Sequence, residues 1–407
     1  MDLAYGPEYE TFRLEVRSFI AEHGHKAPRG GVTGMQAVLD WQALLIEHGY
    51  AARTIPREYG GYGAEPDLLK SRIIAEEFGR ARVSTGMGGQ GIWMLVPTLL
   101  ELGSEAQKRS YIPPTIRGEM LWCQGYSEPN AGSDLASLTT RAEVDGDHWV
   151  INGQKIWTST AQSADMMFAL VRTEPEAPKH QGISYLLIPM DTPGIEVRPL
   201  VQMTGQPGFN EVFFTDVRVP LDNIVGRRGE GWRVANATLS YERGSLADPN
   251  ATRNRFEELV DLMRAETLGG RRVIEDPAMR DRLLRLQSRV LAMQCNDLRV
   301  LSGQLNQDPD TLLARLIVKL QSTELRHELE AMGIDVMGEL GLLYDDSPRL
   351  RAQGSWQQNY MFYLGMIIGG GTSQIQKNII AERGLGMPRE PRAEKQQAPH
   401  KPAQGGA

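Results

Sequence analysis

The chain has little cysteine, no clustered basic residues and no long apolar run. Of its 407 residues, Cys123 and Cys295 are the only cysteines, which excludes a disulfide framework and a cysteine-rich metal site. Its seven histidines are scattered without the spacing of metal ligands. The net charge is −7, from 44 basic and 51 acidic residues, and no basic block indicates a nucleic-acid partner.

The N-terminus also lacks the features of a targeting segment. Acidic residues occur among its first twenty positions, and no apolar run of about 18 residues occurs anywhere in the chain. We therefore expect no signal peptide and no membrane span, and a cytoplasmic location. A hydrophobic content of 41% with 23% charged residues is ordinary for a globular protein, and the length exceeds that of a usual single domain.

Hydrophobic periodicity divides the chain into three folded parts and a tail. Residues 1–122 have helical spacing, with a Pro- and Gly-rich loop at 55–63 and a predicted helix break at Pro113-Pro114. Residues 123–232 contain short β-rich runs at 166–172, 183–190, 195–200 and 211–219, which predict an antiparallel barrel or sandwich. Residues 233–389 are helical again, with starts at Asp276 and Asp310, and the polar tail 390–407 is predicted to be disordered.

One stretch in the β-rich part combines a glycine- and serine-rich loop with a predicted hairpin. Small residues in the loop 126–134 allow backbone N–H groups to approach an anion such as a phosphate. The runs 148–151 and 154–157 flank Asn152-Gly153, which predicts a two-residue turn.

Two helical segments carry further candidate residues. Thr372 or Ser373 can cap a helix running to Gly384, and its N-terminus offers N–H groups to a phosphate. Near the start of the third part, Trp232, Ala235, Leu239 and Glu242 recur at helical spacing. This places the Glu242 carboxylate on an apolar face, where desolvation raises a pKa toward the range of a general base. The alternative is an ordinary helical glutamate paired with a neighbouring arginine.

These motifs resemble those of the acyl-CoA dehydrogenase family. The sequence Ser127-Glu128-Pro129-Asn130-Ala131-Gly132-Ser133-Asp134, the later NGQKIWTS at 152–159 and the GTSQIQ at 371–376 match the family patterns in order, and the resemblance covers all but about the last eighteen residues. It implies an α+β fold with an N-terminal α-helical domain, a middle antiparallel β-barrel and a C-terminal helical bundle. It also implies FAD as cofactor, held without a Rossmann motif, because no G-x-G-x-x-G joins a strand to a helix here.

The resemblance assigns roles residue by residue. FAD contacts are implied for one set of residues: Gln124, Tyr126, Ser127, Gly132, Ser133, Trp157, Thr158, Ser159, Thr372 and Gln374. Substrate contacts are implied for Ser133, Tyr241, Arg243 and Gly370. Many members place the catalytic glutamate where this chain has Gly370, whereas some branches place it in an E-R pair such as Glu242-Arg243, so Glu242 is the predicted base. The glycines at 369–371 suggest room for a bulky acyl group.

Two segments of the family pattern are replaced: the one that reaches a neighbouring subunit's FAD, around residues 269–273, and the adenine segment, near residues 335–338. The predicted function is acyl-CoA dehydrogenation with an electron-transfer flavoprotein as acceptor, in a homotetramer or dimer. Two alternatives stay open. One is an oxidase or monooxygenase on the same fold, and the other is a non-catalytic subunit of a hetero-oligomer.

Overall fold

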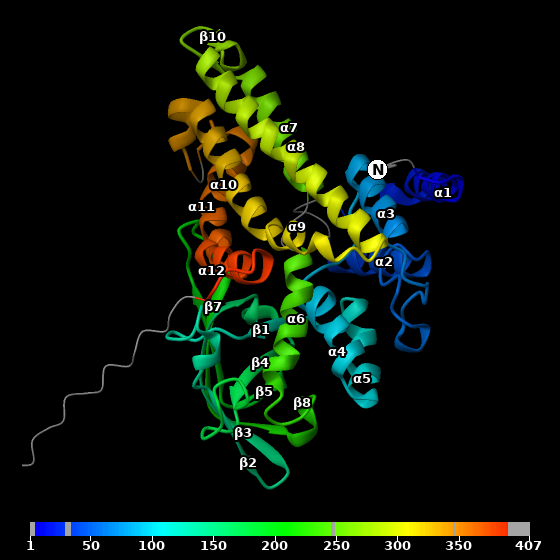
Figure 1. Cartoon of the computed structure of the whole chain (residues 1–407), viewed down its shortest axis with the longest axis vertical. Coiled ribbons are helices and arrows are strands. Elements are labelled where there is room, and N and C mark those ends of the chain that lie inside the picture. Colours follow the sequence, from blue (N-terminus) through cyan, green and yellow to red (C-terminus); the bar gives the residue numbers. More distant parts are fainter. Residues whose placement is uncertain (1–4, 29–33, 246–248, 345–346, 390–407) are drawn as a thin grey trace, which may run out of the picture.

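The computed structural model describes residues 5–28, 34–245, 249–344 and 347–389, with residues 242–245 described by their backbone alone. Helices lead into a β domain, which is followed by a second helical part (Figure 1). The N-terminal helices are α1 (Pro7–His23), α2 (Met35–Glu47), α3 (Leu68–Ala81), α4 (Val96–Leu102) and α5 (Glu105–Ile116), with a π-helical segment, Gly91–Leu95, before α4.

Eight strands form the sheet of the middle part, in the order β6-β7-β3-β2-β4-β5-β8, with β1 paired to β4. They are β1 (Trp122–Gly125), β2 (Arg141–Asp145), β3 (His148–Ser159), β4 (Met166–Arg172), β5 (Ile183–Pro189), β6 (Ile195–Leu200), β7 (Phe209–Pro220) and β8 (Ile224–Val225). The pairing is predominantly antiparallel, as predicted, although β1 lies parallel to β4.

The central strands are buried on both faces. Along β4, Phe168 and Leu170 pack into a core shared with the N-terminal helices, whereas Met167, Ala169 and Val171 pack into the core of the β domain itself. This two-sided burial explains why β4 is a continuous apolar run and not an alternating one.

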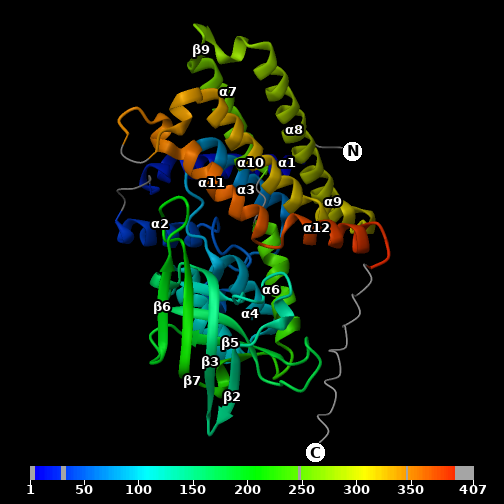
Figure 2. The same ribbon diagram turned by 90° about the vertical axis from the view of Figure 1, so that its left-hand side faces the viewer.

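The C-terminal part comprises α6 (Gly231–Ser245), α7 (Pro249–Ala265), α8 (Pro277–Leu305), α9 (Leu312–Leu316), α10 (Val318–Met337), α11 (Ser355–Ile368) and α12 (Ser373–Ile379), with a small hairpin, β9 (Thr267–Leu268) and β10 (Arg271–Arg272), after α7. Leu283, Leu286, Val290 and Met293 of α8 all lie in the bundle core, as their spacing predicted. The helix α6 instead packs against β5 and α4, and so joins all three parts (Figure 2).

The Asn152-Gly153 pair is not a turn, so the predicted hairpin is wrong at this position. β3 continues through the pair, and the turn between β2 and β3 lies earlier, at Gly146 with φ +63°. At Gly153 the φ is 149°, and a Cβ there would lie 2.6 Å from Thr140 Oγ1. Asn152 Nδ2 donates to Asp216 Oδ1 at 3.0 Å. The pair marks a shift in strand register and a close backbone approach, which also favour glycine.

Two helix boundaries also differ from the sequence prediction. α5 runs through Pro113 and Pro114 to Ile116. The carbonyls that lose their donors to these prolines belong to the exposed residues Arg109 and Ser110, so the helix continues at little cost. Asp310 does not cap a helix, because Asp308 accepts the hydrogen bond from Asp310 N at 2.9 Å. The tail 390–407 lies outside the described residues.

Candidate active site

The end of β3 nearest the helical bundle carries a bulge that turns Trp157 outward. Lys155 pairs with Val212, but the next paired residue is Thr158, opposite Asn210. Trp157 has φ +59°, a left-handed conformation that is uncommon for a bulky residue, and it is 59% exposed. Bulges of this kind redirect side chains beside functional sites. The exposed indole offers a flat apolar surface at the predicted position of the flavin ring.

Thr158 and Asn210 fix the strand behind this indole. Both are fully buried, and Asn210 Nδ2 donates to Thr158 O at 2.9 Å and to Gln162 Oε1 at 2.6 Å. Thr158 Oγ1 is buried and has no hydrogen-bond partner within the described part of the chain. The neighbouring Ser159 is half-buried. Asn210 was not predicted, since only the folded register of β7 brings it to the bulge.

The glycine- and serine-rich loop lies directly beside this strand end. Ser127 O accepts a hydrogen bond from Ile156 N at 2.9 Å, which joins the loop to the bulge. Tyr126 is buried, whereas Gly132 and Ser133 are exposed. The backbone N–H groups of Gly132 and Ser133 donate to no acceptor among the described residues, and space is open where a Gly132 Cβ would stand. This arrangement suits an anionic group.

A buried ion pair anchors the loop to β3. Lys155 is fully buried, and its Nζ donates to Glu128 Oε1 at 2.8 Å and to Tyr126 O at 3.2 Å. Glu128 also accepts from Thr139 N at 2.6 Å and from Thr140 N at 2.8 Å. Burial alone would raise the pKa of Glu128, but the Lys155 charge and these hydrogen bonds outweigh it and lower the pKa to about 2. Burial lowers the pKa of Lys155 to about 8 against the opposing effect of Glu128.

The loop before α12 is the second candidate cofactor element. Gly370 and Gly371 have φ +65° and +95°, and Thr372 Oγ1 accepts from Ile375 N at 3.2 Å, which confirms the predicted cap. Lys319 Nζ donates to Gly371 O at 2.7 Å and so holds the loop on α10. Gln374 is exposed and points to no described partner.

The helix α6 carries the predicted base near its C-terminal end. Val234, Ala235 and Thr238 are buried along one face, and Thr238 Oγ1 lies 3.0 Å from Thr98 Oγ1 of α4. Tyr241 OH donates to Glu101 at 3.0 Å. Glu242 and Arg243 continue the helix, but their side chains lie outside the described set. In both ribbon views this end of α6 lies beside α12 (Figures 1 and 2).

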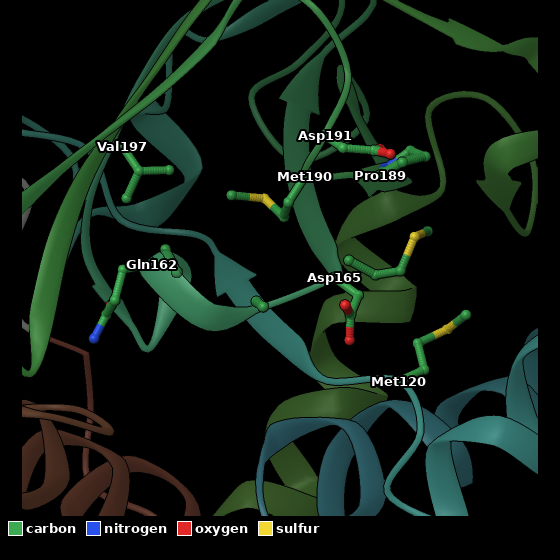
Figure 3. Close-up of a pocket in the computed structure, with 10 residues that line it drawn as sticks. Met120, Gln162, Asp165, Pro189, Met190, Asp191 and Val197 are labelled. Carbon is green, nitrogen blue, oxygen red and sulfur yellow. The ribbon is translucent and has the colours of Figure 1, made fainter.

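A cavity of about 680 Å³ opens at the same end of the sheet (Figure 3). Its wall includes Gln162, Asp165, Met166 and Met190, and it contains none of the predicted site residues. Arg271 and Arg272, by contrast, lie in the exposed β9–β10 hairpin at the far end of the bundle (Figure 1). Within one chain, these arginines and the candidate site are therefore not brought together.

The two glycine-containing loops and the exposed indole fit a flavin nucleotide. The loop 126–134 supplies unused N–H groups for a phosphate, and Trp157 supplies a surface for a planar ring. Together with the helical–β–helical order, these features define the class as an FAD-dependent oxidoreductase.

Comparison with known proteins establishes the family. The models for the N-terminal, middle and C-terminal domains of acyl-CoA dehydrogenase match residues 6–119, 123–217 and 229–385. The chain therefore belongs to the acyl-CoA dehydrogenase family, whose members are FAD-dependent enzymes.

Individual relatives are similar over almost the whole length. Acyl-CoA dehydrogenase IpdE1 of Mycobacterium tuberculosis is 39% identical over 94% of this chain and 99% of its own. Among solved structures, the ChsE4–ChsE5 complex from M. tuberculosis has a TM-score of 0.80 at 31% identity, covering 96% of this chain and all of that chain. The Tcur3481–Tcur3483 steroid acyl-CoA dehydrogenase has a TM-score of 0.79 at 30% identity, with the same coverage. No helix within the described ranges is long and apolar enough to cross a membrane.

Proposed function

We propose that the chain oxidises the Cα–Cβ bond of an acyl-CoA to the trans-2-enoyl-CoA, with Glu242 as the base that removes the α-proton. The neighbouring placement of two elements carries this proposal. The end of α6 that contains Glu242 lies beside α12, whose preceding loop contains Gly370 (Figures 1 and 2). We take these two elements to border the acyl site together, so that a carboxylate from α6 stands in for the one that glycine at position 370 lacks.

The cofactor contacts divide between the β domain and the bundle. Gln124, Tyr126, Ser127, Gly132 and Ser133 would hold FAD from the loop side; Trp157, Thr158 and Ser159 from the strand end; and Thr372 and Gln374 from the α12 side. When bound, FAD supplies the hydride acceptor for the substrate Cβ. The chain itself orients the thioester through Ser133, Tyr241 and Arg243, and accepts the α-proton on the Glu242 carboxylate.

We further propose that the acyl group is bulky or cyclic. Gly369, Gly370 and Gly371 leave the loop before α12 without side chains, and a structural neighbour is described as a steroid acyl-CoA dehydrogenase. A straight short-chain thioester should therefore react more slowly than a ring-bearing one.

The test is anaerobic mixing of the purified protein with a panel of acyl-CoAs, from short straight chains to branched, cyclic and steroid-sized groups. Loss of the oxidised-flavin absorbance with one class identifies the substrate. Glu242→Gln should slow this bleaching by about 10²–10⁴-fold, the usual contribution of a general base. The matched control is Glu230→Gln at the other end of α6, where the carboxylate only pairs with Arg233. Normal bleaching in Glu242→Gln would refute the assignment.

The proposed assembly is a homotetramer or dimer, and the proposed natural electron acceptor is an electron-transfer flavoprotein. A second assembly, with a different chain as neighbour, is favoured by the replaced segments at 269–273 and 335–338, of which the first contains Arg271 and Arg272 in an exposed hairpin. Native mass spectrometry of the chain expressed alone separates these possibilities. A homotetramer with one FAD per subunit supports a single-chain enzyme, whereas substoichiometric FAD supports a two-chain complex. Rapid reoxidation of the reduced protein by oxygen would instead indicate an oxidase.

A further inference from the structure

Gln90 has an amide group whose hydrogen-bonding capacity is poorly used. Its Nε2 donates to Gln124 Oε1 at 3.5 Å, which is at the long limit for a hydrogen bond. Its Oε1 is buried and accepts no hydrogen bond from the residues that the structure describes. Native proteins keep few buried polar atoms in this state, and each one calls for an explanation such as a ligand.

The backbone around Gln90 leaves open space. Gly89 has φ +117°, and no atom lies within 4 Å of the position where its Cβ would stand. On the other side, a Cβ on Gly88 would lie 2.0 Å from Trp93 Cζ2, so glycine is needed for the indole to fold back over this segment. Trp93 itself is 54% exposed. The segment thus presents an exposed indole and an amide, with open space where a Gly89 side chain would stand.

This segment lies where the three parts of the chain meet. Gln124 belongs to β1, and the π-helical segment Gly91–Leu95 that follows Gln90 packs against α6, the helix that carries Glu242. Junctions between domains are preferred sites for small ligands, which are mostly held by apolar walls and oriented by a few polar groups.

We propose that Gln90 is a specificity-determining residue that recognises a hydroxyl group on the acyl portion of the substrate. The inference rests on the proposed function, because it takes the space beside α6 to be the acyl site. The free atom of the amide is Oε1, which accepts a hydrogen bond, and a hydroxyl on the acyl chain can satisfy it in either orientation of the amide, because a hydroxyl both donates and accepts. The Gln90 side chain turns toward it at little cost, because it gives up a single long hydrogen bond to Gln124.

The experiment compares Gln90→Leu with the wild type on two thioesters, 3-cyclohexylpropanoyl-CoA and its ring-hydroxylated isomers. Loss of one neutral hydrogen bond should lower kcat/KM for the best hydroxylated isomer roughly tenfold, while the value for the hydrocarbon stays within about twofold. Gln36→Leu, on the exposed face of α2, is the matched control and should change neither value. Gln90→Asn keeps the amide and should give an intermediate loss on the hydroxylated isomer alone, whereas a purely structural role would lower both values.

The outcomes separate this inference from the proposed function. Equal losses on both thioesters, or no loss on either, would overturn the role of Gln90 while leaving the dehydrogenase assignment intact. A folded, FAD-containing wild type that no thioester bleaches would overturn the proposed function and this inference with it. Thermal unfolding of each variant identifies any that fail to fold, and the Gln90→Asn comparison then decides the question.

Discussion

Replacing Lys155 by methionine should weaken both the fold and the retention of FAD. The ammonium group is fully buried and pairs with Glu128 at 2.8 Å, at the base of the loop that carries Ser127, Gly132 and Ser133. Methionine fills the same volume but leaves the carboxylate buried without its counter-charge. Breaking a buried ion pair in this way costs about 3–5 kcal/mol. We expect about 3 kcal/mol, because Glu128 keeps its hydrogen bonds from Thr139 and Thr140.

A double-mutant cycle isolates the pair. Urea unfolding followed by circular dichroism gives the free energy of unfolding for Lys155→Met, Glu128→Gln and the double variant. The double variant should be less destabilised than the sum of the single variants, since it contains no unpaired buried charge. The FAD-to-protein ratio after gel filtration should fall in Lys155→Met, because the loop loses its anchor.

Lys179→Met is the matched control, because its partner Asp134 lies on the same loop. Lys179 pairs with Asp134 at 2.6 Å, but both side chains are more than half exposed, at 53% and 66%. Such surface pairs contribute about 0–1 kcal/mol. The reasoning that the pair fixes the loop would be refuted by either of two results. One is a loss of less than about 1 kcal/mol in Lys155→Met, and the other is a double variant whose loss in free energy of unfolding equals the sum of the single variants.

Three further predictions address the loops and the bulge. The pKa of Glu128 is lowered to about 2, from an ordinary value near 4.5. The ionised carboxylate therefore contributes its full stabilisation above about pH 4.5 and loses it as the pH falls toward 2. Urea unfolding between pH 7 and 3 should show the free energy of unfolding falling with pH, and Glu128→Gln should flatten this dependence. Gly370→Ala places a residue with a Cβ at φ +65° and should lower the free energy of unfolding by about 1 kcal/mol, measured by thermal unfolding. Gly369→Ala, at φ −62°, should be nearly neutral. Equal losses in the two variants would contradict the strain argument. Trp157→Gly should weaken FAD binding at least tenfold in fluorescence titration, because it removes the exposed indole; unchanged binding would remove the indole from the site.

Features set by neighbouring residues were predictable from the sequence. The Thr372 cap, the start of α8 after Asp276 and the buried stripe of α8 each depend on side chains three or four positions apart, a spacing that the helix itself imposes. The order of helical and β-rich parts followed from hydrophobic periodicity in the same way. The family resemblance then supplied the fold class and the cofactor.

Features set by distant residues were not predictable. Asn152-Gly153 has the composition of a turn, yet contacts with Thr140 and Asp216 hold it in a continuous strand. The same holds for Lys155, whose partner Glu128 lies 27 positions away. The bulge at Trp157 depends on the register of β7, which local sequence does not encode. Residues of this kind can be identified only from the folded sheet.

The proposed site therefore combines a cofactor side fixed by buried contacts with a substrate side that carries fewer side chains. Buried ion pairing and strand register fix the loop 126–134 and the bulge, so a substitution there propagates through several contacts at once. In the proposed function, the substrate side consists instead of the glycines at 369–371, the segment around Gly89 and the last turn of α6. A base has only to reach one carbon atom of the thioester, and the proposal assigns this task to a carboxylate from α6 in place of one from the loop before α12. A glycine before α12 then leaves volume for a larger acyl group, provided that α6 supplies the carboxylate, which links the position of the base to the size of the substrate.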